Sequence, residues 1–143
     1  MPVADAPPPG FVAVGGNSEF SSLVGPFYEK LEDGRLLRGF RVLAKHTNRL
    51  GIAHGGMLLT FADTLLGATL RHVLGGTRPA VTVKLSTDLT MAAPLGAWVE
   101  GSAEVTRAGR NLVFVRGRAW THRRTVLTAE GIFQLLAARK RVD

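Results

Sequence analysis

The segment from Asn48 to Asp63, NRLGIAHGGMLLTFAD, holds the residue types in this chain that are best suited to chemistry. Gly55 and Gly56 begin a long apolar stretch, and a helix starting there leaves several backbone N–H groups open at the positive end of its dipole. Such a helix end can bind a developing oxyanion. The alternative interpretation is structural, because two glycines also allow a tight turn into a helix.

Asp63 is the second chemical candidate, because it is the one charged residue between Gly55 and Leu70. A carboxylate in an otherwise apolar helix costs stability unless it is paired or used in function. The structural interpretation is a carboxylate satisfied by Thr60, Thr64 or a neighbouring strand. The functional interpretation is a catalytic carboxylate.

The spacing of these candidates predicts a homo-oligomer. Gly56 and Asp63 are seven positions apart, or about 10.5 Å along a helix, whereas a catalytic carboxylate and an oxyanion donor must both lie within about 3 Å of the reacting group. One helix therefore cannot supply both to the same carbonyl. Two antiparallel copies related by a two-fold axis can, so we expect a dimer at minimum, with the site across its interface.

The sequence lacks the motifs of several other enzyme classes. It has no GxSxG, no Walker A loop, no GxGxxG after a strand, no HExxH and no cysteine. The four histidines, at positions 46, 54, 72 and 122, are scattered rather than spaced as metal ligands. We therefore expect no metal and no cofactor.

A single long helix is predicted over residues 55–74, which contain helix formers and no proline and are followed by two glycines. Because this stretch is apolar on all sides, protein must cover both of its faces. A loop is expected over 46–53, and the predicted strands are 35–45, 80–91, 97–107, 111–120 and 125–137. One helix and a run of antiparallel strands indicate an α+β fold in which a curved sheet wraps around a central helix.

Length and composition favour one domain. Residues 1–16 are rich in Pro, Gly and Ala, so we expect them to form a flexible N-terminal arm and residues 17–143 to form a single domain.

The third and fourth of the predicted strands are expected to form a hairpin with a three-residue loop. In the expected register Val105 pairs with Val113, which places small and apolar side chains toward the helix. The opposite face then pairs Glu100 with Arg118.

The chain has 143 residues and a net charge of +7, and this charge is unevenly distributed. Residues 1–105 hold 9 Lys and Arg against 9 Asp and Glu, whereas residues 106–143 hold 9 against 2. Because the excess cations are spread over predicted strands rather than along one helix, we expect no nucleic-acid partner.

Two features bear on location. The start, MPVADAPPPG, lacks a basic region followed by an apolar run, so we expect no signal peptide and a cytoplasmic protein. Asp63 near the middle of the longest apolar stretch would cost about 2.5–3.5 kcal/mol at the centre of a bilayer, so we expect no membrane span.

The spacing N-x-x-G-x-x-H-G-G, with an aspartate seven positions later, resembles the hotdog-fold acyl-CoA thioesterases of the phenylacetyl-CoA thioesterase type. The residues that carry the resemblance are Asn48, Gly51, His54, Gly55, Gly56 and Asp63. The resemblance continues through GPFYEKLEDGRL before this segment, and through VTVKLSTDLTMAAPLG and the pair Gly109-Arg110 after it.

This resemblance implies hydrolysis of an acyl-CoA, or of a related acyl thioester, to a free acid and a thiol. The catalytic set that it implies is Asp63, Gly55, Gly56, Asn48, His54 and Thr82. In that set Asp63 would be the nucleophile or the general base, and a glycine N–H would polarise the thioester carbonyl. Asn48 and His54 would help to hold the thioester or the water, and Thr82 would orient the water or Asp63.

The polyanionic character of CoA offers a use for part of the basic C-terminal quarter. The candidate CoA-binding residues are Arg107, Arg110, Arg139 and Lys140, and the candidate acyl-pocket residues are Met57, Leu59 and Leu66. Sheets that pack back to back would make the dimer a homotetramer.

Two alternatives share the acyl thioester ligand. One is a hotdog hydratase or dehydratase, and the other is a non-catalytic acyl-CoA-binding or regulatory hotdog protein. Release of free thiol distinguishes a thioesterase from both.

Overall fold

The computed structural model describes residues 5–15 and 18–138 of the chain. These residues form seven strands, two α-helices and one short 3-10 helix. In chain order the elements are β1 (Val12–Ala13), α1 (Glu19–Val24), β2 (Tyr28–Glu32), β3 (Arg35–Arg41), η1 (Ala44–His46), α2 (Gly55–Leu74), β4 (Ala80–Leu89), β5 (Trp98–Ala108), β6 (Leu112–Thr121) and β7 (Arg124–Leu135).

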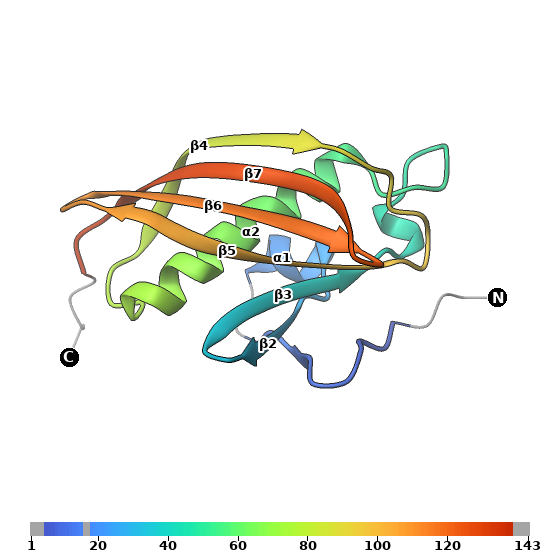
Figure 1. Cartoon of the computed structure of the whole chain (residues 1–143), viewed down its shortest axis with the longest axis horizontal. Helices are drawn as coiled ribbons and strands as arrows, with labels where there is room; N and C mark the ends of the chain where they lie inside the picture. Colours follow the sequence, from blue (N-terminus) through green and yellow to red (C-terminus); the bar gives the residue numbers. More distant parts are fainter. Residues whose placement is uncertain (1–4, 16–17, 139–143) are drawn as a thin grey trace.

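The strands described form one antiparallel sheet in the order β1-β2-β3-β5-β6-β7-β4. The sheet curls around α2, which crosses one of its faces (Figure 1). β2 and β3 join through a two-residue turn in which Asp33 and Gly34 both have positive φ angles, 52° and 76°, as a type I′ turn requires. The predicted α+β hotdog arrangement, a curved antiparallel sheet around a central helix, is confirmed.

Several short elements differ from the sequence prediction. β1 and β2 are not predicted, because each is too short to show a clear alternation of apolar residues. The strand predicted over 35–45 ends at Arg41, because the chain then turns into the 3-10 helix η1. These differences lie on the far side of the sheet from β4.

α2 spans the 20 residues predicted for it and forms the core of the protein. Phe61 and Leu66 are fully buried, and the ring of Phe61 packs on the rings of Phe27 and Phe40. Gly75 ends the helix in the left-handed conformation, with a φ of 84°. By length and composition α2 resembles a membrane span, but half of that stretch is buried inside the domain.

The β5–β6 hairpin forms where it is predicted, but the expected register is wrong. Val105 pairs with Val115 rather than with Val113, and the expected pairing of Glu100 with Arg118 is absent. The loop begins one residue later than expected, and a bulge follows Val105. Because the shift is by two residues, the side chains predicted to face the helix still do so.

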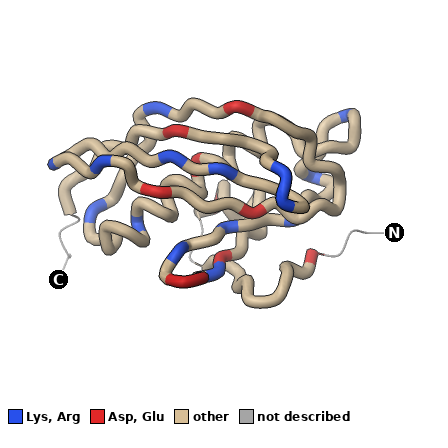
Figure 2. The backbone as a smooth tube through the Cα atoms, viewed as in Figure 1, with Lys and Arg blue, Asp and Glu red and all other residues tan. Residues whose placement is uncertain are grey.

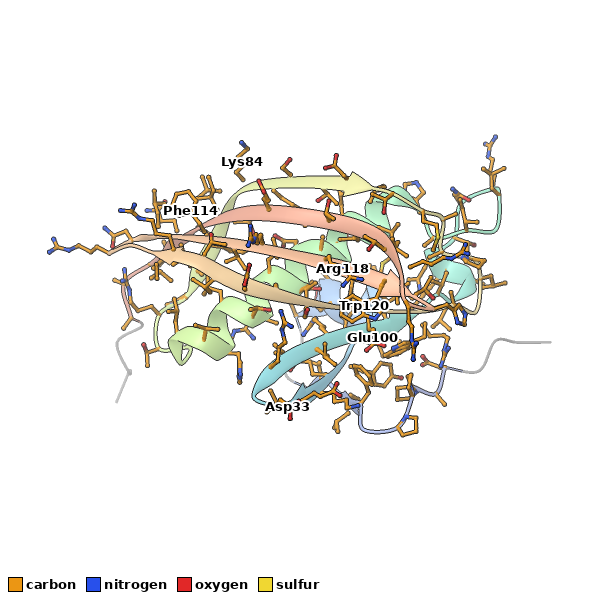
Figure 3. All side chains as sticks on the ribbon, viewed as in Figure 1. Asp33, Lys84, Glu100, Phe114, Arg118 and Trp120 are labelled. Carbon is orange, nitrogen blue, oxygen red and sulfur yellow. The ribbon has the colours of Figure 1, made fainter. Side chains whose placement is uncertain are left out.

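β4 lies at the edge of the sheet and pairs with β7 alone among the strands described. Its apolar side chains are unusually open, since Val81, Val83 and Leu89 are 44%, 56% and 46% exposed. In Figure 3 the side chain of Lys84 points away from the sheet at this edge. A long exposed apolar edge is a site of pairing with another chain unless it is covered.

Part of the predicted N-terminal arm packs against the sheet. The ring of Phe11 lies 5.0 Å from that of Trp98, and Arg41 Nη2 donates to the carbonyl oxygen of Ala6 at 2.6 Å. The boundary expected at residue 16 falls outside the described residues, and the division into an arm and one domain stays a prediction.

Candidate active site

The N-terminus of α2 is shaped by His54, which is the N-cap residue. Its Nδ1 accepts the N–H of Gly56 at 2.8 Å, and its carbonyl oxygen accepts the N–H groups of Met57 and Leu58 at 2.9 and 3.1 Å. The N–H of His54 itself donates to the carbonyl oxygen of His46 at 2.8 Å, so three of the four N–H groups that the helix leaves open, those of His54, Gly56 and Met57, are occupied. Among the described residues, the N–H of Gly55 has no partner. Of the two glycines proposed from the sequence, Gly55 is thus the one with a free donor.

His46 positions the loop that leads to this helix end. It is 3% exposed, its Nδ1 accepts the N–H of Leu43 at 3.0 Å, and its carbonyl oxygen accepts the N–H of His54 at 2.8 Å. Because Nδ1 is an acceptor, the ring proton is on Nε2, which donates to the carbonyl oxygen of Val24 at 2.5 Å. Burial lowers the pKa of His46, and this outweighs the opposing effect of the bond to Val24. The sequence analysis missed this residue, since a scattered histidine carries no motif.

Asn48 holds the same loop in place. Its Oδ1 accepts the N–H groups of Leu50 and Ile52 at 2.9 and 3.4 Å. Gly51 within this turn has a φ of 73°, a conformation that favours glycine. Within the part of the chain that the structure describes, the Nδ2 donors of Asn48 make no hydrogen bond and are available to a ligand.

Asp63 is held by the strand that follows the helix. Thr82 Oγ1 donates to Asp63 Oδ1 at 2.6 Å, which is the short distance expected for a hydroxyl bonded to a carboxylate. The nearby Thr60 and Thr64 donate instead to carbonyl oxygens of α2. A β-bulge lies between Thr82 and Lys84, and bulges of this kind often aim a side chain next to an active site.

The candidate site residues fall into two separate groups in the structure. The structure brings Asp63 to Thr82 of β4 and His54 to Gly56, but Asp63 and Gly56 lie on different turns of α2. Surface hollows of 210–530 Å³ occur elsewhere in the described part of the chain, and none of those is lined by Asp63 or Gly55.

The three candidate acyl-pocket residues lie in different surroundings. Met57 and Leu66 are 7% and 0% exposed and pack in the core, whereas Leu59 is 41% exposed on α2. Leu59 is therefore the one of the three that a ligand or a second protomer can reach without any rearrangement of the core.

The candidate CoA-binding residues are divided by the fold. Arg107 and Arg110 are exposed at the β5–β6 hairpin tip and line a hollow of about 390 Å³ with Phe114. Arg139 and Lys140 lie outside the described residues. The structure adds two cations that the sequence analysis did not select: Arg78 donates to the carbonyl oxygen of Arg110 at 2.9 Å, and Arg71 lies on the last turn of α2.

No group of three or more His, Asp or Glu side chains that could hold a metal ion occurs among the residues with described positions. The candidate residues present a carboxylate bonded to a hydroxyl at Asp63 and Thr82, and, separately, N–H donors at the start of α2 and on Asn48. This combination can activate water or attack a carbonyl, and it can polarise that carbonyl.

Comparisons with known proteins agree on one family. Residues 50–128 match the model of the thioesterase superfamily. The chain is 35% identical over 129 residues to the Pseudomonas aeruginosa protein named "Putative esterase PA0474", a match that covers 90% of this chain and 96% of the relative.

Two solved structures share the fold. The BH2602 protein from Bacillus halodurans, solved with CoA, has a TM-score of 0.76 at 23% identity, over 88% of this chain and 83% of that one. A mutant of the phenylacetic acid degradation protein PaaI from Thermus thermophilus has a TM-score of 0.72 at 24% identity, over 83% and 100%. The chain belongs to the thioesterase superfamily and is a thioester hydrolase with the hotdog fold.

Proposed function

We propose that this protein hydrolyses acyl-CoA to a free carboxylic acid and CoA, at a site shared by two protomers. One observation carries the proposal: in a member of the thioesterase superfamily, Asp63 stands in the middle of the core helix with Oδ1 bonded to Thr82 at 2.6 Å. An acidic residue held in this way is oriented for chemistry rather than neutralised by a cation. The CoA bound in the Bacillus halodurans relative supports CoA as the carrier.

The geometry supports a division of roles between the protomers. Asp63 of one protomer either attacks the thioester carbon, which releases the thiolate and forms a mixed anhydride, or removes a proton from the water that attacks it. The N–H of Gly55 from the other protomer faces the carbonyl oxygen and stabilises the negative charge that develops there. A donor of this kind contributes roughly 2.7–4 kcal/mol in enzymes where it has been removed.

The remaining residues of the set support these two groups. Thr82 fixes the carboxylate, and His54 fixes the first turn of the helix through the N–H of Gly56. The free Nδ2 donors of Asn48 bind the thioester oxygen or the water.

The exposed edge strand β4 supports the dimer. A second copy that pairs its own β4 antiparallel to this one would cover Val81 and Val83 and continue the sheet across a two-fold axis. The same axis sets two α2 helices antiparallel, which is the arrangement that brings Gly55 of one copy to Asp63 of the other.

We also propose that the dimers pair into a homotetramer and that the protein is cytoplasmic; the outer face of the sheet bears on the first of these. A shallow hollow of about 530 Å³ lies on it, and its charged lining residues are evenly divided in sign: Arg35, Arg116, Arg118, Asp88, Glu104 and Glu130. Arg116 pairs with Glu104 at 2.6 Å, and Arg118 stacks over Trp120 at 4.7 Å, beside Glu100 in Figure 3. A face with balanced charges is complementary to a second copy of itself.

The test is release of free CoA from short, medium, long and aromatic acyl-CoAs by the native protein and by Asp63→Asn. We expect release by the native protein and none by the variant, with Asp33→Asn, an exposed carboxylate in the β2–β3 turn, as the matched control. Equal activity in Asp63→Asn would remove this carboxylate from the mechanism. A native protein that binds acyl-CoA without releasing thiol would favour a binding or regulatory role.

A labelling experiment distinguishes the two chemical routes. If Asp63 attacks the thioester, water then opens the mixed anhydride at the aspartyl carbon and adds its oxygen to Asp63. After many turnovers in heavy-oxygen water, the peptide that contains Asp63 therefore carries heavy oxygen. If Asp63 acts as a general base, the heavy oxygen enters the released acid alone.

A further inference from the structure

His46 is a buried histidine that the catalytic proposal does not use. It is 3% exposed, and its ring lies edge-on to the ring of Phe40 with the centroids 5.3 Å apart. Buried polar groups carry hydrogen bonds, and both ring nitrogens have one. The bond from the N–H of Leu43 to Nδ1 is local, whereas the bond from Nε2 to the carbonyl oxygen of Val24 joins residues 22 positions apart.

The bond to Val24 fixes η1 to the end of α1. The last carbonyl oxygens of a helix have no partner within that helix. At the end of α1 two of them accept from neighbouring residues of η1, because Lys45 Nζ donates to Leu23 at 3.0 Å and the His46 ring donates to the next carbonyl. Lys45 is exposed, whereas His46 is buried. The His46 bond is therefore the one of the two that water does not weaken.

Residues 43–54 form a loop whose two branches join at His46 and His54. The carbonyl oxygen of His46 accepts the N–H of His54 at 2.8 Å. The branch that leads into α2 is bonded to a neighbouring loop, since the N–H of Ala53 donates to the carbonyl oxygen of Ala93 at 2.7 Å. The branch that leads away from β3 is held instead at α1, through η1.

Charge does not hold this loop in place. Residues 43–54 contain two cations, Lys45 and Arg49, and no acid. Figure 2 shows blue positions and no red one where the loop projects at the right of the view. The ion pairs in the described part of the chain lie on β2, β3, β5 and β6. The position of the loop therefore depends on its hydrogen bonds, among them the buried one at His46.

Both groups of N–H donors at this end of α2 follow His46 closely in the chain. Gly55 comes directly after His54, whose N–H is bonded to His46. Asn48 lies two residues after His46, and its Oδ1 bonds across the tip of the same loop. A displacement of about 1 Å at a catalytic group can cost roughly a hundredfold in rate. A shift of the loop at His46 would therefore reach both donors.

We propose that His46 is a positioning residue for the hydrolysis, because its bond to Val24 holds the loop against α1. The loop in turn aims the N–H of Gly55 and the Nδ2 donors of Asn48 at the thioester. The inference rests on the proposed acyl-CoA hydrolysis and adds a residue that touches no substrate. Loss of the bond should lower kcat and leave KM almost unchanged, because donors of this kind act mainly in the transition state.

The experiment uses three substitutions of His46 that separate its two bonds. His46→Asn places an amide oxygen near Nδ1, so it keeps the bond to Leu43 and loses the bond to Val24. His46→Gln places an amide N–H near Nε2 and keeps the bond to Val24. His46→Phe keeps a ring beside Phe40 and removes both bonds.

We expect kcat for a hydrolysed acyl-CoA to fall about 100-fold in His46→Phe and in His46→Asn, with KM within about twofold of the native value. His46→Gln should stay within about fivefold of the native kcat. The matched control is His72→Phe, which should keep the native kcat. His72 is an exposed histidine at the other end of α2, and its Nε2 also lies within hydrogen-bond distance, 3.2 Å, of a carbonyl oxygen, that of Gly34.

Thermal unfolding is measured first, and rates are compared at a temperature at which each variant is folded. If His46→Phe does not fold, His46→Asn carries the comparison with His46→Gln. Native kcat in folded His46→Asn overturns the inference and leaves the catalytic proposal standing. Equal losses in His46→Asn and His46→Gln also overturn it, because the bond to Val24 would then not be what matters. A higher KM with native kcat overturns it as well.

Hydrogen exchange of the His54 N–H, resolved by NMR, gives a readout that needs no turnover. This N–H is bonded to the carbonyl oxygen of His46. Its exchange should be roughly tenfold faster in His46→Asn than in the native protein, and close to native in His46→Gln. That result in a protein that hydrolyses no acyl-CoA supports the positioning by His46, and then it is the catalytic proposal that fails. Unchanged exchange in His46→Asn overturns the inference.

Discussion

Removal of the Thr82 hydroxyl tests the hydrogen bond that fixes Asp63. Thr82→Val keeps the volume and the β-branched shape of the side chain but deletes the donor to Asp63 Oδ1 at 2.6 Å. A hydrogen bond to a charged group contributes about 1.5–3 kcal/mol, and because Thr82 is exposed and Asp63 is half-buried, the lower end applies. If the transition state loses about 1.5 kcal/mol of stabilisation, kcat decreases about tenfold.

The assay is thiol release at saturating acyl-CoA, followed for the native protein, Thr82→Val and Thr82→Ser. We expect Thr82→Ser to keep most of the activity, because it keeps the hydroxyl, and Thr128→Val, an exposed threonine on β7, to behave as the native protein. Thermal unfolding of all variants should change little, since an exposed strand position affects stability by less than about 0.5 kcal/mol. Native kcat in Thr82→Val would refute the argument that this bond orients the carboxylate.

Three further predictions concern stability and assembly. The free energy of unfolding should decrease as the pH falls below about 6.5, because burial lowers the pKa of His46 and the unfolded chain then binds a proton that the folded chain resists. Urea unfolding between about pH 8 and pH 5 measures this dependence, which should persist in a variant of the exposed His122 and disappear on replacement of His46. Gly101→Ala should destabilise the fold by about 1–3 kcal/mol, because its Cβ would lie 2.7 Å from a backbone oxygen of β6, whereas Gly15→Ala, with nothing within 4 Å, should be neutral in the same thermal melt. Val83→Lys on the free edge of β4 should give monomers by gel filtration and abolish thiol release together, and an active monomer would disprove a site shared between protomers.

The candidate site was predictable where its signal is local in the sequence. The helix over 55–74 follows from its composition, the absence of proline and its terminal glycines, and its boundaries are those observed. Asp63 is conspicuous because it is an acid within an apolar helix. Its bond to Thr82 agrees with the alternative that a neighbouring strand satisfies the carboxylate, and this contact is also what a positioned catalytic group requires.

Other parts of the site could not be predicted, because they depend on contacts between distant segments. The role of His46 depends on two contacts: the N–H of Leu43 donates to its Nδ1, and its Nε2 donates to the carbonyl oxygen of Val24. Nothing in the local sequence indicates these contacts. The choice of Gly55 over Gly56 as the free donor depends on the rotamer of the His54 ring.

The sequence by itself determined the fold class, the core helix and the family, because hydrophobic period, glycine placement and motif spacing are properties of neighbouring residues. Only the tertiary structure decided the register of the β5–β6 hairpin, since two registers that differ by two residues bury the same face and a bulge selects between them. The tertiary structure also brought Arg78, which lies outside the basic C-terminal quarter, to Arg110, which lies within it. Such a cluster arises because α2 and the β5–β6 hairpin end at the same side of the domain, and a linear sequence does not record where its elements end in space.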